Sequence, residues 1–253
     1  MLIETRYSKY DAFARIYHEE WGQEQSEWAL QPLEKLLIPH LPKDAHIFDL
    51  CCGTGQLSQQ LLLKGYRVTG LDGSEAMLHY ARQNAPEAHF ILGDARFFEF
   101  PPTYQAVISM SASLNHVTSI EELTGVFHNV HTALLADGLF VFDLNLEERY
   151  QSLLWNGSMG GNVTDKYAWA VRQSYEPEEK IGTIATTTFQ LIEENWQRSD
   201  MTWMVKGYSR VEVESALENV GFVDIRISDA ERDFAIEGKA GNAYFVCRKR
   251  LNG

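Results

Sequence analysis

Short apolar runs alternate with amphipathic stretches from residue 47 to residue 145. The apolar runs cover residues 47–50, 67–71, 89–92, 106–110 and 139–143. Each run is nearly continuous instead of alternating with polar residues, which is typical of strands buried on both faces. Strands of this kind, separated by helices, predict a parallel sheet with helices packed on both sides.

Several helices are marked by the residues at their ends. Ser74 is a good N-cap, and Ser119 and Ser209 are each followed three residues later by glutamate, which is the capping-box pattern. Residues 9–38 carry apolar side chains at helical spacing, including a stripe of aromatic residues. The Asp-Gly pair at residues 137–138 predicts the end of the helix that begins after Ser119.

The alternation breaks after residue 145. Three β-prone runs follow without clear helices between them, at residues 167–171, 184–191 and 201–205, and turn residues lie at 177–182. The α/β pattern then resumes at Ser209 and ends with two strands, at residues 223–227 and 243–247.

We therefore expect an α/β fold with a largely parallel sheet, plus a small antiparallel β insertion. The predicted organisation is an N-terminal helical lid segment (1–40), a central domain made of residues 41–149 and 207–253, and an insertion (150–206) that covers the substrate side.

Composition narrows the classes of partner. The chain has 253 residues, 45% of them hydrophobic, and a net charge of −13. The acidic balance argues against nucleic acid as a partner, because phosphate binding needs a basic surface. No apolar run approaches the roughly 20 residues that span a membrane, and the N-terminus does not resemble a signal peptide. Three cysteines suggest no disulfide framework, so we expect a cytoplasmic protein. We also expect a monomer or homodimer without a metal site.

Polar residues follow the ends of the first three predicted strands. Gly53 and Gly55 follow the first strand, Asp72 ends the second and Asp94 follows the third. A glycine-rich turn lets a ligand approach the backbone at a helix N-terminus. An acid at the end of the second strand can accept hydrogen bonds from both hydroxyls of a ribose. These strand ends therefore predict a nucleoside pocket.

The glycine turn also fits a degenerate dinucleotide fingerprint, in which Asp72 would hold the ribose of a nicotinamide cofactor. Two features count against this interpretation. The third position of the fingerprint is Ser58, where close helix packing favours Gly or Ala, and Asp94 supplies a second acid beside the nucleoside.

Taken together, these residues resemble the class I S-adenosylmethionine-dependent methyltransferase family. The similarity covers about residues 45–145 and 208–250. Asp49-x-Cys51-x-Gly53-x-Gly55 looks like the family's first motif, with Cys51 where the first glycine is usual. The resemblance implies a Rossmann-like doubly wound fold, with a seven-stranded sheet of six parallel strands and the last strand antiparallel. It also implies S-adenosyl-L-methionine as cofactor and an insertion that roofs a small-molecule pocket.

The resemblance also implies roles for individual residues. Asp72 would bind the ribose and Asp94 the adenine amino group of the donor. Asp49, low in the glycine loop, either reaches the methionine ammonium or only stabilises the turn by accepting backbone hydrogen bonds. Tyr10 and Tyr17 either pack on the sheet or form a lid over the methionine end. The full set expected to bind the donor is Asp49, Cys51, Gly53, Gly55, Asp72, Gly73, Met77, Asp94, Ala95, Met110, Tyr10 and Tyr17.

Catalytic candidates lie after the fourth strand, where a loop reaches the region of the reactive methyl group. His116 is the best general-base candidate, although a lone histidine also fits a helix cap or a core position. Asn115 is a candidate for orienting substrate or backbone. Four tryptophans of the insertion form either a small core or an apolar substrate pocket: Trp155, Trp169, Trp196 and Trp203.

The predicted function is methyl transfer to a small-molecule acceptor. The absence of an Asn-Pro-Pro-Tyr sequence argues against amino-group methylation of nucleic acids. Three alternatives stay open at this point: a methyltransferase acting on RNA or protein, a nicotinamide-dependent oxidoreductase, and a binding module without catalysis.

Overall fold

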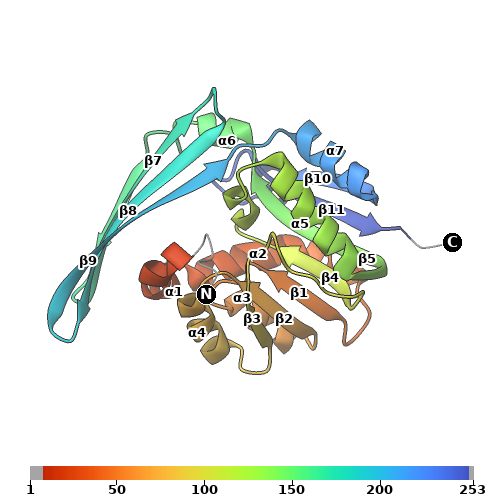
Figure 1. The fold of residues 1–253 in the computed structure, drawn as a ribbon, viewed down its shortest axis with the longest axis horizontal. Helices are drawn as coiled ribbons and strands as arrows, with labels where there is room; N and C mark the ends of the chain where they lie inside the picture. The colour runs from red at the N-terminus through yellow and green to blue at the C-terminus, as the bar shows by residue number, and fades with distance from the viewer. Residues whose placement is uncertain (1–7, 251–253) are drawn as a thin grey trace.

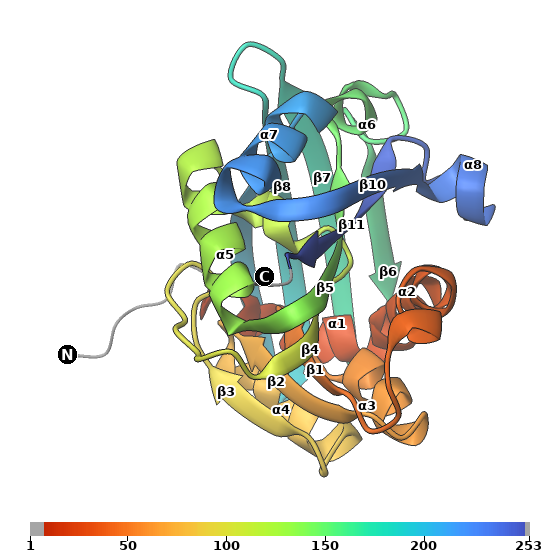
Figure 2. The ribbon, with the colours of Figure 1, turned by 90° about the vertical axis from the view of Figure 1, so that its right-hand side faces the viewer.

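A seven-stranded mixed sheet forms the centre of the protein (Figures 1 and 2). The computed structural model describes residues 8–250, so residues 1–7 of the predicted N-terminal segment lie outside it. The strand order is β10-β11-β5-β4-β1-β2-β3, and β11 is antiparallel to both of its neighbours. This confirms the predicted sheet with its reversed last strand. The strands are β1 (His46–Leu50), β2 (Arg67–Asp72), β3 (His89–Leu92), β4 (Tyr104–Ser109), β5 (Leu134–Asn145), β10 (Phe222–Asp229) and β11 (Asn242–Lys249).

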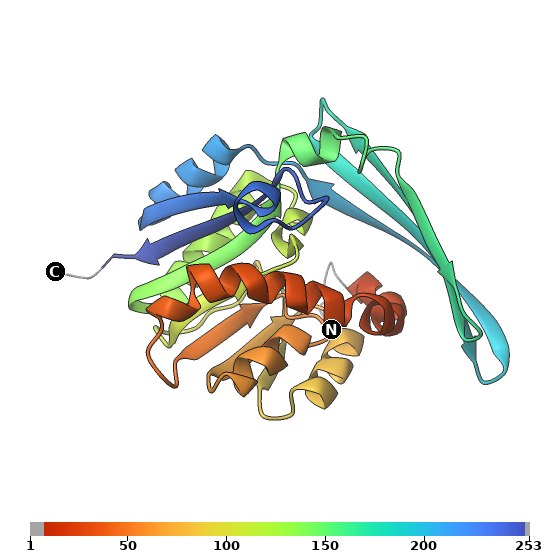
Figure 3. The ribbon, with the colours of Figure 1, turned by 180° about the vertical axis from the view of Figure 1, so that it is seen from behind.

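Helices cover both faces of this sheet. One face packs against α5 (Ile120–Ala133) and α7 (Arg210–Val220), and the other against α2 (Gly22–Leu36), α3 (Gln56–Leu63) and α8 (Ala230–Phe234). Figure 3 shows α2 lying along the second face. Successive residues of a strand point to opposite faces, so the fully buried Phe140, Val141 and Phe142 contribute to both cores. This two-sided burial explains why the strands read as continuous apolar runs.

The N-caps begin their helices as predicted. The Ser74 hydroxyl accepts a hydrogen bond from the Met77 amide at the start of α4 (Glu75–Asn84). Ser119 does the same for α5, and Ser209 and Glu212 form a complete capping box at α7. These caps satisfy amide groups that a helix N-terminus leaves without partners.

A second, four-stranded antiparallel sheet is inserted between β5 and α7. Its strands are β6 (Met159–Val163), β7 (Tyr167–Glu176), β8 (Ile181–Ile192) and β9 (Asn195–Lys206), in that order. Figure 1 shows that these long strands extend beyond the seven-stranded sheet and pass over the N-terminal helices. Strand β6 escaped prediction because two of its five residues are glycine and it carries little β-branched character.

The N-terminal helices lie between the two sheets. They are η1 (Ser8–Phe13) and α1 (Ala14–Glu20), and the buried Phe13 and Ile16 pack against Trp203 of the insertion. Three of the four tryptophans of the insertion pack in small apolar clusters, and the fourth is exposed. Trp203 and Trp155 are buried in two small clusters, Trp169 contacts Trp21, and Trp196 is exposed.

One expectation about the central domain was wrong. Helix α5 ends at Ala133, and residues 137–138 lie within β5, where a register shift against β4 accommodates them as a bulge. Cys247 is buried because β11 lies between β10 and β5. The short helices α6 (Glu147–Gln151) and α8 were not predicted.

Between residues 8 and 250, no helix combines the length and apolar character needed to cross a bilayer.

Candidate active site

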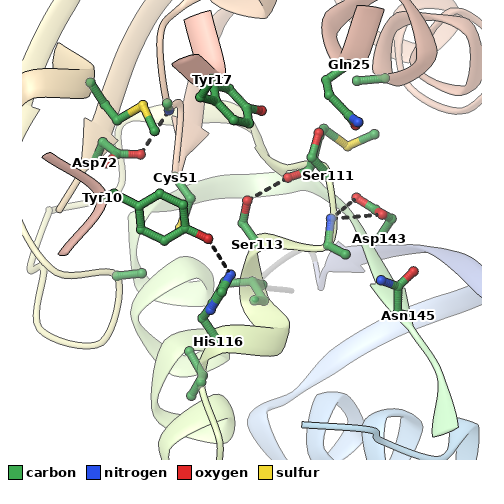
Figure 4. Close-up of a pocket in the computed structure, with 18 of the residues that line it drawn as sticks. Tyr10, Tyr17, Gln25, Cys51, Asp72, Ser111, Ser113, His116, Asp143 and Asn145 are labelled. Carbon is green, nitrogen blue, oxygen red and sulfur yellow. Dashed lines mark hydrogen bonds between the residues drawn. The ribbon is translucent and has the colours of Figure 1, made fainter. Parts of the chain in front are cut away.

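A cavity of about 270 Å³ opens at the carboxyl ends of the parallel strands. Figure 4 shows Asp72 on one side of it, Asp143 and Asn145 on the other, and Ser111 and Ser113 between them. Nine residues expected to bind the donor line this cavity: Tyr10, Tyr17, Cys51, Gly53, Asp72, Gly73, Met77, Ala95 and Met110. His116, the expected general base, also lines it.

Asp72 is held at the end of β2 by the backbone around it. One carboxylate oxygen accepts a hydrogen bond from the Gly53 amide (2.9 Å) and the other from the Ser74 amide (2.9 Å). Burial raises the pKa of the Asp72 carboxyl to about 6, although these two hydrogen bonds act in the opposite direction. Each oxygen keeps acceptor capacity toward the cavity, because a carboxylate oxygen has two lone pairs.

Asp49 lines a smaller adjoining cavity of about 50 Å³ that shares Tyr17, Cys51, Gly53 and Ser111 with the larger one. Asp49 is buried, and the Ser58 hydroxyl donates to its carboxylate at 2.6 Å. Burial raises its pKa to about 7, and the charge of Asp72 adds to this rise. A buried carboxylate of this kind is stabilised in its ionised form by a cation, so this small cavity favours an ammonium group.

Gly55 shapes the site without lining either cavity. Its φ of +79° lies in the left-handed region, and a Cβ atom there would lie 2.8 Å from the Cα and Cβ atoms of Ala81. Glycine therefore allows α4 to pack closely against the turn that starts α3. This close packing, not a ligand contact, is what the structure shows for Gly55.

Three strand-end acids converge on Cys51. Burial raises the pKa of the Cys51 thiol, and the charges of Asp72, Asp49 and Asp94 raise it further. Asp94 itself does not line the cavity, whereas its neighbours Gly93 and Ala95 do.

The carboxylate of Asp94 is paired with Arg96. It accepts hydrogen bonds from Arg96 Nε (3.0 Å) and Nη2 (2.6 Å), and Arg96 Nη1 donates to Glu122 (2.8 Å). No sequence pattern predicted this partner of Asp94. An adenine contact by Asp94 stays a prediction, and it would have to be made alongside the pairing with Arg96.

The N-terminal helices supply one wall of the cavity. The Tyr10 hydroxyl lies 2.9 Å from Nε2 of His116, and the Tyr10 ring stacks on Trp203 with centroids 4.6 Å apart. Tyr17 extends into the same space, where burial and the nearby Asp72 and Asp49 charges raise its pKa to about 12 (Figure 4). A neutral phenol is therefore what Tyr17 presents at physiological pH. Both tyrosines pack on neighbouring elements and also reach the cavity.

Asn115 lies outside the cavity and is fully buried. Its amide nitrogen donates to the carbonyl oxygens of Asn145 (2.9 Å) and Lys206 (2.7 Å), and its oxygen accepts from the Asn145 amide (2.9 Å). The expectation of a catalytic residue that touches substrate is corrected here. Asn115 joins the ends of β5 and β9, and its position orients backbone.

The far end of the cavity contains residues that the sequence reasoning missed. Asp143 and Asn145 come from the end of β5, and Asn242 and Tyr244 come from the start of β11, where Asn242 pairs with Asn145. Asp143 ends a predicted strand, as Asp72 does, so the same strand-end argument applies to it. The β11 residues follow from the reversed strand, because the amino end of an antiparallel strand lies at the same rim as the carboxyl ends of its parallel neighbours.

Asp143 fixes the loop after β4. Both of its oxygens lie within 3.1 Å of the Ala112 amide, and the Asn242 amide nitrogen donates to one of them at 2.7 Å. Burial raises the pKa of Asp143, and these hydrogen bonds oppose the rise. Ser111 and Ala112 both have positive φ, as does Cys51 at the opposite wall. Such backbone strain concentrates at functional sites, where neighbouring contacts hold it.

Comparisons with known proteins point to one family. A family profile described as a methyltransferase domain matches residues 47–138. A putative methyltransferase of Bacillus subtilis, YqeM, is 27% identical over 247 residues, which are 95% of this chain and 97% of the relative. A dTDP-3-amino-3,6-dideoxy-alpha-D-glucopyranose N,N-dimethyltransferase of Streptomyces fradiae is 31% identical over 128 residues, about half of each chain.

A solved structure shares the fold over nearly the whole chain. The amino pentose methyltransferase CalS10 of Micromonospora echinaspora, solved with S-adenosylmethionine bound, has a TM-score of 0.69 at 19% identity. The alignment covers 95% of this chain and 96% of CalS10.

Proposed function

We propose that the chain is a class I S-adenosylmethionine-dependent methyltransferase, and that it transfers the methyl group of this donor to a small molecule bound in the same cavity. The observation that carries the proposal is the continuity of the cavity. It runs from Asp72 to Asp143 and Asn145 without a wall between them, so donor and acceptor share one space.

The residues present fit the donor group by group. Asp72 offers two carboxylate oxygens to the ribose hydroxyls, beside the backbone of Gly53. Asp49, in the small adjoining cavity, offers a buried negative charge to the ammonium. Met77 and Ala95 supply apolar surface for the adenine ring.

When bound, the donor supplies a methyl group already activated by its positive sulfur, so the chain's main task is alignment and exclusion of water. Asp72 and Asp49 would hold the donor so that its methyl group could pass to the acceptor's lone pair and leave a neutral thioether behind. Tyr10 and Tyr17 close the cavity from the side of the N-terminal helices.

The Tyr10–His116 pair takes the acceptor's proton. The two side chains are 2.9 Å apart and both line the cavity. A proton that leaves the acceptor for the Tyr10 oxygen can be matched by transfer of the tyrosine proton to His116, so that the charge ends on the imidazole. Positioned groups of this kind contribute about 10²–10⁴-fold to rate.

A small acceptor is favoured over RNA or protein. The net charge of −13 opposes a nucleic acid partner, and the acceptor end, lined by Asn145, Asn242 and Tyr244, belongs to a cavity of about 270 Å³, which suits a small molecule. The three cysteines are free, which agrees with a reducing compartment such as the cytoplasm.

The test uses S-adenosylmethionine labelled on its methyl group, together with a cell extract separated by ultrafiltration into small molecules and macromolecules. We expect label only in the small-molecule fraction, with stoichiometric formation of S-adenosylhomocysteine. Label confined to RNA or protein would contradict the proposed acceptor class, and failure of the protein to bind S-adenosylhomocysteine would contradict the function as a whole.

A further inference from the structure

Lys239 introduces a positive charge into the wall of the large cavity. It lies in the loop between α8 and β11 and lines the large cavity but not the small one that contains Asp49. Its Nζ atom lies 4.6 Å from the ring centroid of Trp28, which also lines the cavity. Among the described residues, no carboxylate approaches this ammonium within ion-pair distance.

The loop that carries Lys239 is held in place. Arg149 Nη1 donates to the carbonyl oxygens of Gly238 (2.9 Å) and Ala240 (3.1 Å), on either side of Lys239. The Asn242 amide donates to the Lys239 carbonyl at 2.9 Å. A Cβ atom on Gly241 would lie 2.9 Å from the Arg149 backbone nitrogen, so the loop and α6 are in close contact. The lysine is therefore presented by a fixed backbone.

Charges of both signs surround Lys239, but none pairs with it directly among the described residues. Burial and the nearby Arg149 both lower its pKa, whereas Asp143 and Glu24 raise it. Asp143 shares the cavity wall and accepts hydrogen bonds from the Ala112 amide and Asn242. A partly buried ammonium beside a second cation gains most from an anionic ligand.

We infer that Lys239 binds an anionic group, a carboxylate or a phosphate, carried by the methyl acceptor. The neutral donors Asn145, Tyr244 and Gln25 line the same cavity and can complete the hydrogen bonding of that group. This inference rests on the proposed function, since it assigns the Lys239 end of the cavity to the acceptor and the Asp72 end to the donor.

The experiment measures anion binding to the protein saturated with S-adenosylhomocysteine, by calorimetric titration at constant ionic strength. The probes are citrate for carboxylates, pyrophosphate for phosphates, and glucose as the neutral control. Lys239→Met removes the charge and keeps the stem on Trp28, and Lys239→Arg keeps the charge. Lys35→Met is the matched control, because Lys35 also lies over an aromatic ring, Phe234, at 5.2 Å but outside the cavity.

We expect saturable binding of citrate or pyrophosphate and none of glucose. Lys239→Met should weaken anion binding by about tenfold or more, since charge-assisted hydrogen bonds are lost, whereas K239R and K35M should retain it. The stronger of the two probes identifies the group as carboxylate or phosphate.

Three results would overturn the inference: no saturable binding of either anion, equal binding by K239M and the parent protein, or a loss of S-adenosylhomocysteine affinity in K239M. The last would assign the lysine to the donor. If the parent protein does not bind S-adenosylhomocysteine, the proposed function fails, and the anion titrations of the unliganded protein still decide whether Lys239 binds an anion.

Discussion

Replacing Asp72 with alanine tests the donor-binding end of the cavity. The substitution removes two acceptors for the ribose hydroxyls. Hydrogen bonds to a charged group contribute ~1.5–3 kcal/mol each, so two of them contribute ~3–6 kcal/mol. At about 1.4 kcal/mol for each factor of ten, Asp72→Ala should weaken binding of S-adenosylhomocysteine by about 10²–10⁴-fold.

Stability should change far less than affinity. The Gly53 and Ser74 amides lose their acceptor, which costs on the order of 1 kcal/mol each. The variant also loses a buried carboxylate whose pKa is raised to about 6, and this removes an unfavourable charge at neutral pH. The two effects oppose each other, so a folded variant is expected.

The assay is isothermal titration with S-adenosylhomocysteine at pH 8, where Asp72 is ionised. Asp165→Ala, which removes an exposed acid of the insertion, controls for net charge. Ser209→Ala controls for stability, because it removes the N-cap of α7 far from the donor residues. An affinity of Asp72→Ala within about threefold of the parent, in a folded protein, would refute the ribose assignment.

Three further predictions concern catalysis, pH and packing. His116→Ala should lower turnover by about 10²-fold or more with little change in donor affinity; steady-state kinetics with unchanged kcat would remove it as the base. The pKa of the Asp49 carboxyl is about 7 in the folded protein, against an ordinary value of 3.8. Because the native state binds the carboxyl proton more tightly than the unfolded state, the free energy of unfolding should fall as pH rises from about 4 to about 7. Asp49→Asn should reduce that decline by at most ~4 kcal/mol, measured by denaturant titrations at several pH values. A pH profile identical to that of the parent protein would contradict the raised pKa of the buried Asp49 carboxyl. Gly55→Ala should lower Tm because its Cβ meets Ala81, whereas Gly125→Ala, in an open position within α5, should stabilise by roughly 0.5–1 kcal/mol; the reverse order of melting temperatures would contradict the packing account.

Strands with a single strong signal were predictable from the sequence. The continuous apolar run at β1, followed by Gly53 and Gly55, and the run that ends at Asp72 defined both the sheet and one end of the cavity. The capping patterns at Ser119 and Ser209 correctly placed the starts of α5 and α7. In each case local chemistry and the global fold favour the same conformation.

The remainder depended on contacts between distant segments. Arg96, which pairs with Asp94, is also bonded to Glu122 from 26 residues away, and Asn115 orients the backbone of β5 and β9 from 30 and 91 residues away. Lys239 lies in a loop of no regular pattern, and only the reversal of β11 brings that loop to the rim. Sequence spacing carries no information about such juxtapositions until the order of the strands is known.

The central claim is that one cavity holds the donor by Asp72 and Asp49 and leaves its far end to the acceptor. A crystal structure of the complex with S-adenosylhomocysteine tests it most directly. We predict both ribose hydroxyls within hydrogen-bond distance of Asp72, the ammonium beside Asp49, and the sulfur facing Tyr10 and His116. A ribose bound away from Asp72, or a ligand that fills the end lined by Asn145 and Lys239, would contradict it.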